Sequence, residues 1–304
     1  MQSTELIWMD GSLVPWAEAN VHVLSHGLHY GTGAFEGIRA YETARGPAVF
    51  RLTDHMARLI RSCKAIGLPI DWSLDDLVKA GKEILAVNGL MSGYIRPIVF
   101  YGTGSIGLNP AGARLHTVIA TWEWGAYLGE EGLRDGIRIA TSSWRRIDNR
   151  SMMPNAKATG PYINSVIAKQ EALRAGYDEA LMLNGDGQVA EGSGENLFLV
   201  RGGVVYTPPV AAGVLDGITR DSVVTLLTDD GFVVSEATLS RTDVYYADEA
   251  FFTGTAAEVT PIREVDDRPI GEGRPGPVTR RAQELFMGTV TGDLDTHPEW
   301  LEHI

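Results

Sequence analysis

The order of strand and helix signals along this 304-residue chain constrains its fold more than any other feature. Short segments typical of strands follow one another in runs, and segments with helical periodicity lie between these runs. A doubly wound parallel sheet would require strand and helix to alternate regularly. The sequence therefore predicts an α+β fold, and the chain is long enough to form two domains.

Residues 1–123 form the expected smaller, N-terminal domain. Its strand signals lie over 7–16, 38–52, 94–101 and 115–122, of which the first two have the pattern of hairpins. Thr53 is the expected N-cap of one helix and Ser73 of a second. Pro97 lies within a strand signal and predicts a sheet edge or a β-bulge, because proline has no N–H to donate.

A glycine-rich segment over 124–132 is the expected interdomain loop, so residues 133–304 form the expected larger domain. Strand signals in this part lie over 137–142, 180–183, 188–191, 196–200, 204–207, 232–235 and 250–253. A helix is predicted over 161–175, and Thr219, Ser240 and Thr279 mark the expected starts of three more.

The formal net charge of −13 argues against a nucleic-acid or anionic-membrane surface, since both need basic patches. Any anionic ligand would need a local group of positive donors. Cys63 is the single cysteine, which excludes an internal disulfide and a cysteine metal cluster and fits a reducing compartment. We expect no metal site. The start of the sequence has no signal-peptide pattern and no long apolar run follows, so we expect a cytoplasmic protein.

One lysine stands apart from the others. Only five of the 26 basic residues are lysines, and four of them lie on polar faces of predicted helices, where a solvated charge is the usual interpretation: Lys64, Lys79, Lys82 and Lys169. Lys157 instead lies in the small-residue segment PNAKATG over 154–160, which should pack closely against another part of the protein. A loop lysine is most often a surface charge, so its position alone assigns Lys157 no role.

Two segments of small residues offer backbone N–H groups to an anion. Gly217-Ile218-Thr219 leads directly into a helix, whose first N–H groups, hydroxyl and dipole suit a phosphate. The segment GTAA over 254–257 follows a strand signal and forms a second such turn. An ordinary helix cap and an ordinary β-turn explain these two segments when each is taken alone.

The segment EGSGENLF from Glu191 to Phe198 is more specific, because two glutamates bracket its glycines. Glycines let the backbone approach a flat ligand closely, with a carboxylate at the turn. A plain β-turn between two strands is the structural alternative.

Taken together, these segments resemble a known signature. The stretch from Glu191 through Asn196 to LDGITR at 215–220 resembles that of the fold-type IV pyridoxal-phosphate enzymes. Six further segments resemble the branched-chain amino-acid aminotransferases in particular: HYG at 29–31, FEGIR at 35–39, YIRP at 94–97, GLNP at 107–110, WGAY at 124–127 and GTAAE at 254–258. The resemblance covers about 7–292 and implies a small N-terminal α/β domain, a larger C-terminal domain with a barrel-like sheet, and a cofactor between them.

The resemblance also implies pyridoxal 5'-phosphate as the cofactor and identifies its ligands. Lys157 is implied to form a Schiff base with it and then to carry the proton between the substrate Cα and the cofactor C4′. Glu191 is implied to face the pyridine nitrogen and to keep the ring protonated. Tyr162 is implied to meet the phenolic oxygen. The other implied cofactor ligands, most of them around the phosphate, are Arg58, Leu215, Gly217, Ile218, Thr219 and Thr255.

The implied reaction moves the amino group between leucine, isoleucine or valine and 2-oxoglutarate. Arg96 is implied to accept the side-chain carboxylate of glutamate, and Thr255 and Ala256 the α-carboxylate. Tyr30 and Leu108 are implied to come from a neighbouring subunit, which requires at least a homodimer and is compatible with a hexamer. The other implied substrate residues are Phe35, Gly37, Arg39, Tyr94, Trp124, Tyr127, Tyr162 and Ala257.

Two other classes of function are compatible with parts of this pattern. A D-amino-acid or R-selective amine aminotransferase, or a lyase, would share the cofactor residues, and only the FEGIR, YIRP and GTAAE segments favour the branched-chain hypothesis. A non-catalytic binding protein on this scaffold need not keep both Lys157 and Glu191, and the presence of both argues against it. A sheet-edge ion pair at Arg96 and domain packing at Trp124 and Tyr127 are structural interpretations of the pocket residues.

Overall fold

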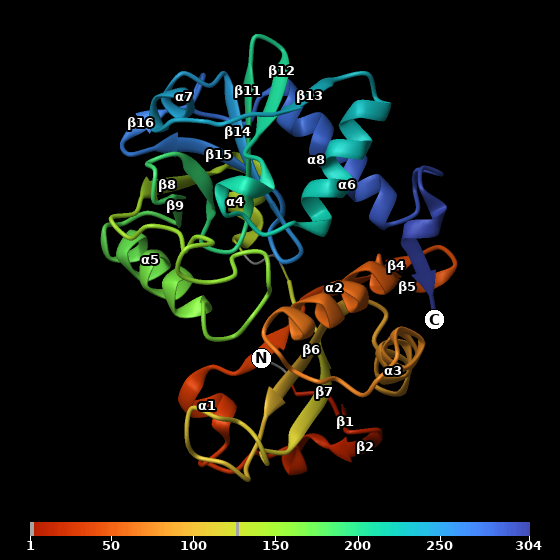
Figure 1. The fold of residues 1–304 in the computed structure, drawn as a ribbon. Coiled ribbons are helices and arrows are strands. Elements are labelled where there is room, and N and C mark those ends of the chain that lie inside the picture. The colour runs from red at the N-terminus through yellow and green to blue at the C-terminus, as the bar shows by residue number, and fades with distance from the viewer. Residues whose placement is uncertain (1–2, 126–127) are drawn as a thin grey trace. The chain divides into compact units, whose positions relative to one another are not determined.

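The computed structural model describes residues 3–125 and 128–304, and the chain divides into two compact units (Figure 1). Unit 1 comprises Met1–Gly125, Ala156–Gly160 and Thr289–Ile304, and unit 2 comprises Ala126–Asn155 and Pro161–Gly288. The segment around Lys157 and the C-terminal residues therefore pack with unit 1, although both follow residue 132 in the sequence. The division into folding domains at 124–132 stays a prediction.

Unit 1 is built on an eight-stranded sheet in the order β17-β5-β4-β6-β7-β1-β2, with β3 paired to β6. The strands are β1 Leu6–Met9, β2 Ser12–Pro15, β3 Gly33–Phe35, β4 Ile38–Thr43, β5 Gly46–Phe50, β6 Gly93–Tyr101, β7 Leu115–Trp122 and β17 Leu301–His303. The helices are α1 His26–Tyr30, α2 Leu52–Ala65 and α3 Leu74–Val87, with 3-10 turns at Trp16–Glu18 and Pro298–Trp300. Both predicted hairpins, β1–β2 and β4–β5, are confirmed.

Helix α2 packs on the core of unit 1 through an apolar stripe, with Met56, Leu59 and Cys63 buried in that core. The predicted cap at Thr53 is wrong, because Arg51 occupies the N-cap position with a φ of 50°. The Thr53 N–H and hydroxyl instead donate to the carboxylate of Glu302, at 2.6 and 2.9 Å. The partner lies 249 residues away in the sequence, so no local pattern could indicate it.

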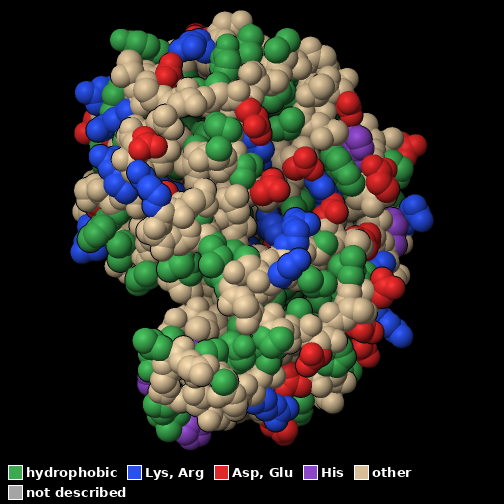
Figure 2. Space-filling view, in the orientation of Figure 1, with side chains coloured by type: hydrophobic (Ala, Val, Ile, Leu, Met, Phe, Trp, Pro, Cys, Tyr) green, Lys and Arg blue, Asp and Glu red, His purple; other side chains and the backbone are tan. Residues whose placement is uncertain are grey.

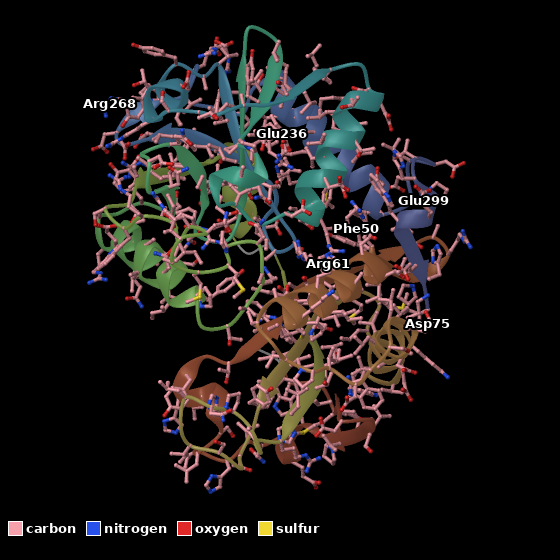
Figure 3. The ribbon with its side chains drawn as sticks, viewed as in Figure 1. Phe50, Arg61, Asp75, Glu236, Arg268 and Glu299 are labelled. Atoms are coloured by element: carbon pink, nitrogen blue, oxygen red, sulfur yellow. The ribbon has the colours of Figure 1, made fainter. Side chains whose placement is uncertain are left out.

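The carboxylate of Glu302 reaches α2 because the end of the chain adds a strand to the sheet. Strand β17 pairs antiparallel to β5, with Leu301 opposite Phe50, which Figure 3 labels. The Phe50 ring also meets Trp300 edge-on, with ring centroids 5.9 Å apart. The C-terminus therefore helps to fix the start of α2.

Strand β6 lies inside the sheet, between β4 and β7, so the sheet edge predicted from Pro97 is wrong. Strand β7 pairs with β6 on one side. On the other side, β4 pairs with the residues of β6 up to Ile95 and β3 pairs with those from Ile98 onward. Pro97 stands opposite the break between them, and its carbonyl accepts from the Glu36 N–H at 2.9 Å. The missing N–H of proline thus falls where the partner strand is interrupted.

Unit 2 contains a nine-stranded sheet in the order β10-β9-β8-β15-β14-β11-β12-β13, with β16 paired to β15. The strands are β8 Ile137–Thr141, β9 Glu179–Leu183, β10 Val189–Gly192, β11 Asn196–Arg201, β12 Val204–Thr207, β13 Val233–Glu236, β14 Glu249–Gly254, β15 Glu258–Val265 and β16 Arg268–Pro269. Because β10 also pairs with β11, at Glu191 and Asn196, the strands from β10 to β11 close into a ring. The expected barrel-like sheet is therefore confirmed.

The helices of unit 2 are α4 Gly129–Asp135, α5 Tyr162–Arg174, α6 Ile218–Asp229, α7 Arg241–Tyr245 and α8 Pro277–Val290, with a 3-10 turn at Val210–Ala212. Helix α8 ends in the segment that belongs to unit 1. The loop predicted over 124–132 is wrong in its last part, since α4 begins at Gly129. In the core, the rings of Phe198 and Phe251 stack with centroids 5.0 Å apart.

Acidic and basic side chains are interspersed on the face shown in Figure 2, in agreement with the many surface ion pairs, such as Arg281 with Asp230 at 2.7 Å. Among the described residues, each helix is too short or too polar to cross a bilayer.

The segment that contains Lys157 is held against the end of α1 and against β3. Gly31 ends α1 with a φ of 64°, and its carbonyl accepts from the Gly160 N–H at 3.0 Å. A Cβ atom at Gly31 would lie 2.5 Å from the Gly160 Cα, which is too close for any side chain. Ala34 and Ala158 form an isolated antiparallel bridge beside this contact. Glycine at 31 therefore allows the Lys157 segment to approach.

We expect Gly31→Ala to destabilise the protein by about 2–4 kcal/mol, from a left-handed backbone and from overpacking. Gly89→Ala is the matched control, since Gly89 has a φ of 65° and a Cβ added there would meet no atom within 4 Å. The control should lose only about 1–2 kcal/mol, the cost of the backbone conformation. Urea unfolding followed by circular dichroism measures both. Equal losses would show that the approach of Gly160 contributes nothing.

Candidate active site

Lys157 is fixed by its backbone between a strand and a helix of unit 1. Its N–H donates to the Ser62 hydroxyl on α2 at 3.0 Å, and its carbonyl accepts from the Phe35 N–H at the end of β3 at 3.0 Å. The Lys157 amine lies 5.2 Å from the centre of the Phe35 ring. The expectation that this small-residue segment packs closely is confirmed.

Helix α2 carries a buried polar stripe beside its apolar one. His55, Arg58 and Ser62 are spaced to lie on one face of a helix, and all three are buried. The sequence identified Arg58, but not His55 or Ser62, as a candidate. Buried polar side chains repeated at helical spacing were the signal that could have identified them.

Glu36 is the partner of this stripe and is fully buried. Its carboxylate accepts from Arg58 Nε at 2.6 Å and from Arg58 Nη2 at 2.9 Å, a two-point pair. His55 Nδ1 lies 2.8 Å from the same carboxylate. Burial opposes the charge of Glu36, but Arg58 and His55 outweigh it and hold the pKa of the carboxyl well below its usual range. Burial lowers the pKa of His55, so its neutral imidazole donates to Glu36.

Arg96 on β6 lies among aromatic rings of the same unit. Its guanidinium carbon is 5.0 Å from the centre of the Phe35 ring, 5.2 Å from that of Tyr94 and 5.8 Å from that of Trp122. Arg96 Nη2 donates to the Tyr94 hydroxyl at 3.2 Å. Arg96 Nε is buried and has no hydrogen-bond partner in the described part of the chain. A carboxylate bound here would accept a hydrogen bond from this unsatisfied N–H.

The other predicted substrate residues of unit 1 lie around this cluster. Trp124 packs edge-on against Tyr94, with ring centroids 4.4 Å apart, and its carbonyl accepts from Arg39 Nη2 at 2.9 Å. Gly37 touches the same tyrosine, since a Cβ there would lie 1.8 Å from the Tyr94 hydroxyl. Tyr127 lies outside the described residues.

Tyr30 and Leu108, predicted to reach a neighbouring subunit, are 43% and 87% exposed in the single chain. The structure therefore does not bring them into the Arg96 cluster within one chain.

In unit 2, Glu191 on β10 is buried and its carboxylate accepts hydrogen bonds. Among the donors are Arg146 Nε at 2.7 Å, the Leu215 N–H at 3.0 Å and Asn196 Nδ2 at 3.1 Å. Asn196 Nδ2 also donates to the Leu215 carbonyl at 2.9 Å. The sequence placed Asn196 in the motif without a role, and it gave no indication of Arg146, which lies 45 residues away.

The predicted phosphate turn lies at the start of α6 in the same unit. The predicted cap at Thr219 is wrong, because Gly217 is the N-cap and Thr219 is the second helical residue. The N-cap Gly217 has no side chain with which to cap the helix. A Cβ at Gly217 would lie 1.9 Å from Asn196 Oδ1, so glycine lets the helix start approach the Glu191 network.

The remaining predicted residues of unit 2 lie at the starts or ends of elements. Tyr162 is the first residue of α5, after Pro161 as the N-cap. Thr255, Ala256 and Ala257 form the turn from β14 to β15. Unit 2 thus brings Glu191, Leu215 and the start of α6 together, and unit 1 brings Lys157, Arg58 and Phe35 together.

Comparisons with known proteins agree with the resemblance. The family described as amino-transferase class IV matches residues 33–265. A branched-chain-amino-acid aminotransferase of Pseudomonas aeruginosa is 52% identical over 97% of this chain and 96% of its own length. The crystal structure of the Escherichia coli branched-chain amino acid aminotransferase has a TM-score of 0.97 and 46% identity over 99% of both chains. That of the branched-chain amino acid aminotransferase from Thermobaculum terrenum in its PLP-form has a TM-score of 0.92 and 35% identity, over 99% of this chain and 98% of that chain.

This chain belongs to the class IV aminotransferases. Its identities of 46% and 52% over nearly the full chain place it with the branched-chain-amino-acid aminotransferases of that family. The expected family and the expected fold-type IV architecture are therefore confirmed.

The aminotransferase has a second buried carboxyl beside Glu191. Glu195 ends the turn from β10 to β11, and its Oε2 accepts from the Gly194 N–H at 3.0 Å. Burial, and then the neighbouring Glu179 carboxylate, raises the pKa of Glu195 to about 8, against the opposing charge of Lys169. Lys169 pairs with buried Glu179 at 2.6 Å, so the solvated charge expected there is wrong.

The raised pKa of Glu195 makes stability depend on pH. Between the unfolded pKa near 4.5 and the folded pKa of about 8, the folded protein keeps a proton that the unfolded chain has lost. The contribution of Glu195 to the free energy of unfolding is complete below the unfolded pKa. It decreases as the pH rises from there and is lost once the pH passes the folded pKa. Glu195 should therefore lower the free energy of unfolding by up to about 1.4 kcal/mol per pH unit in this window. We expect Glu195→Gln, which cannot ionise, to remove this dependence on pH. Urea unfolding of both proteins at several pH values gives the two slopes, and parallel profiles would exclude a protonated Glu195.

Proposed function

We propose that the enzyme transfers amino groups between the branched-chain L-amino acids leucine, isoleucine and valine and 2-oxoglutarate, with pyridoxal 5'-phosphate held on Lys157. The substrate assignment depends on the surroundings of Arg96. It offers an unsatisfied, buried Nε within a wall of aromatic rings. One pocket can therefore accept an apolar side chain against the rings or the second carboxylate of glutamate at the guanidinium.

The residues present fit pyridoxal phosphate. The molecule combines an aldehyde, a basic ring nitrogen and a phosphate, which need an amine, a carboxylate and a set of N–H donors. Lys157 is the amine and Glu191 is the carboxylate. Arg58 and the N–H groups at the start of α6 are the donors for the phosphate. In the proposed set, Ile218 contributes its N–H, Thr219 and Thr255 their hydroxyls, and Tyr162, Leu215 and Gly217 complete the site.

When bound, pyridoxal phosphate supplies an aldehyde carbon that takes up the amino group and a ring that accepts electrons from the substrate Cα. Lys157 would move the proton between the substrate Cα and the cofactor C4′. Glu191 would hold a proton on the ring nitrogen, and its hydrogen bonds from Arg146, Asn196 and Leu215 would keep its carboxylate oriented for this task.

The substrate is oriented at both ends in this proposal. Thr255, Ala256 and Ala257 form a turn whose N–H groups bind the α-carboxylate, together with Tyr94. The residues that we propose for the wall around the side chain are Phe35, Gly37, Arg39, Trp124, Tyr127 and Tyr162. The carbonyl of Trp124 accepts from Arg39, a contact that holds this wall together.

The relatives favour this assignment over a D-amino-acid or R-selective amine aminotransferase. The Pseudomonas aeruginosa and Escherichia coli proteins both carry the branched-chain name, at 52% and 46% identity. Initial rates with D-alanine or (R)-1-phenylethylamine that equal the rate with L-leucine would contradict the assignment.

Lys157→Ala should reduce transamination of L-leucine by at least about 1,000-fold, because it removes both the covalent attachment and the proton carrier. The visible absorption band of the bound cofactor should also shift to that of the unattached aldehyde. Lys79→Ala, at an exposed helix position, is the matched control and should keep the wild-type rate. Full activity of Lys157→Ala would refute the mechanism.

Arg96→Leu should separate the two substrates. We expect kcat/KM for glutamate to fall about 100-fold, since a carboxylate would be buried without a charged partner, and kcat/KM for leucine to change less than about tenfold. Single-turnover kinetics with each amino acid measures both values in one enzyme preparation. An equal loss for both substrates would show that Arg96 has only a structural role.

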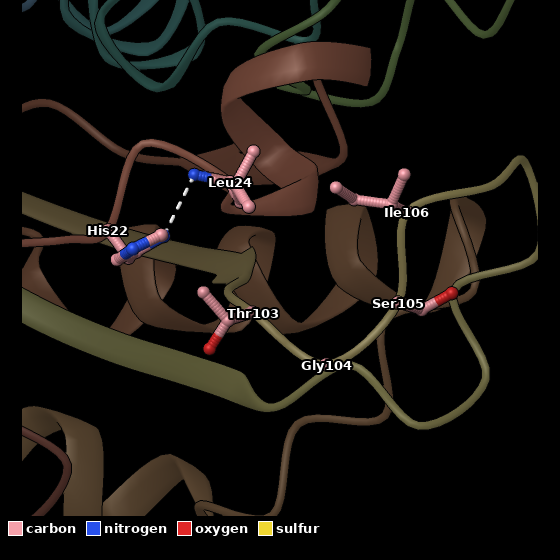
Figure 4. A pocket seen from close by; sticks show the side chains of 6 residues that line it. All are labelled: His22, Leu24, Thr103, Gly104, Ser105 and Ile106. Carbon is pink, nitrogen blue, oxygen red and sulfur yellow. Dashed lines mark hydrogen bonds between the residues drawn. The ribbon is translucent and has the colours of Figure 1, made fainter.

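We further propose a cytoplasmic enzyme that works at least as a homodimer, with a hexamer as a compatible larger form. The exposed side chains of Tyr30 and Leu108 support a subunit contact in unit 1, as does a nearby hollow of about 570 Å³ lined by His22, Leu24, Thr103, Gly104, Ser105 and Ile106 (Figure 4). In it the Leu24 N–H donates to His22 Nδ1 at 3.1 Å. A fully active monomer in analytical ultracentrifugation would contradict the shared site.

A further inference from the structure

Glu36 is the most completely buried charge of unit 1, and its carboxylate is directed at Arg58. Arg58 donates to it from Nε and Nη2, the neutral His55 donates to Oε2, and the Gly37 N–H lies 3.2 Å from Oε2. Burying a carboxylate, a guanidinium and an imidazole together is costly unless each is paired. Glu36 carries no role in the function proposed above.

The geometry of this pair fixes the plane of the Arg58 guanidinium. A guanidinium is planar and has two edges that can bind an oxyanion in two-point fashion. The bonds to Glu36 engage the edge formed by Nε and Nη2. The plane and the direction of the second edge are then set by Glu36, and Glu36 is in turn fixed by His55.

The same helix face also sets the position of Lys157. Ser62 follows Arg58 by four residues on α2, and its hydroxyl accepts from the Lys157 N–H at 3.0 Å. The arginine proposed to bind the phosphate and the lysine proposed to bind the aldehyde are thus both positioned by the polar face of α2. The spacing between these two groups is fixed by one rigid element.

We propose that Glu36 and His55 are positioning residues for the cofactor phosphate: they hold Arg58 so that its second edge meets the phosphate. The inference rests on the proposed role of Arg58. It also predicts an effect of the Glu36 carboxylate on phosphate binding that is opposite to the effect of its charge. Charge alone would make Glu36 unfavourable, since a carboxylate near a phosphate dianion repels it. If orientation is the larger effect, removing the carboxylate weakens phosphate binding.

The test compares pyridoxal 5'-phosphate with pyridoxal, which lacks the phosphate. Both aldehydes can react with Lys157, so the ratio of their dissociation constants isolates the contribution of the phosphate. The ratio is measured by absorbance titration of the full chain after removal of its cofactor, without any turnover. In Glu36→Gln we expect the preference for pyridoxal 5'-phosphate to fall about tenfold or more, with pyridoxal changed less than about twofold.

Glu302→Gln is the matched control. It removes a carboxylate that binds the start of the same helix, at Thr53, but does not contact Arg58. The control should keep the wild-type ratio even if it lowers thermal stability. A preference that is unchanged or increased in Glu36→Gln would overturn the inference, and so would an equal loss for both aldehydes.

Arg58→Gln separates failure of this inference from failure of the proposed function. If Arg58→Gln keeps the wild-type ratio, Arg58 is not a phosphate ligand and the phosphate site proposed above fails. If Arg58→Gln lowers the ratio and Glu36→Gln does not, only the inference fails. In the double variant, Glu36→Gln should have no further effect on the ratio, because it acts through Arg58.

His55→Leu keeps the inference testable if Glu36→Gln does not fold. This variant retains the Glu36–Arg58 pair but removes the hydrogen bond that holds Glu36, so the ratio should fall by about threefold. A ratio equal to that of the wild type would show that His55 does not position the pair.

Discussion

The pairing of Glu191 with Asn196 closes the sheet of unit 2, and the proposed chemistry depends on it. These two residues form the register pair between β10 and β11, so the strands join into a barrel at this point. The Asn196 amide holds the Glu191 carboxylate and also bonds to the Leu215 carbonyl. The pairing of these two residues therefore both closes the barrel and orients the carboxylate. A change at Asn196 would disturb both.

In each unit a carboxylate is buried against a guanidinium: Glu36 pairs with Arg58 and Glu191 with Arg146. Buried ion pairs add little stability over apolar side chains of similar size, whereas loss of one partner is costly, roughly 3–5 kcal/mol. Their presence is better explained by function than by stability. In both cases the pair fixes the direction of a group that is proposed to meet the cofactor.

Local sequence patterns predicted local structure well. The Ser73 cap and the β1–β2 hairpin depend on neighbouring residues, and the structure confirms them. Patterns failed where the partner is distant. Thr53 donates to Glu302 and does not cap a helix. Pro97 is tolerated inside a sheet because the partner strand is interrupted opposite it.

The residues of the candidate site divide in the same way. Lys157, Glu191 and the 217–219 turn were identifiable because a short segment carries each of them. Glu36, His55 and Arg146 were not, since their importance arises only from pairing across 19 or more residues.

An acidic chain with a formal charge of −13 must bind a dianion without an overall attractive field. The structure suggests how this is possible. In the proposed site, Glu36 neutralises the charge of Arg58 but fixes its direction, and the start of α6 contributes N–H groups with about half a positive charge. Oriented donors at short range can outweigh a repulsive net charge, because salt screens exposed charges beyond about 10 Å. Local direction of the donors, more than total charge, is thus what a phosphate site in this protein requires.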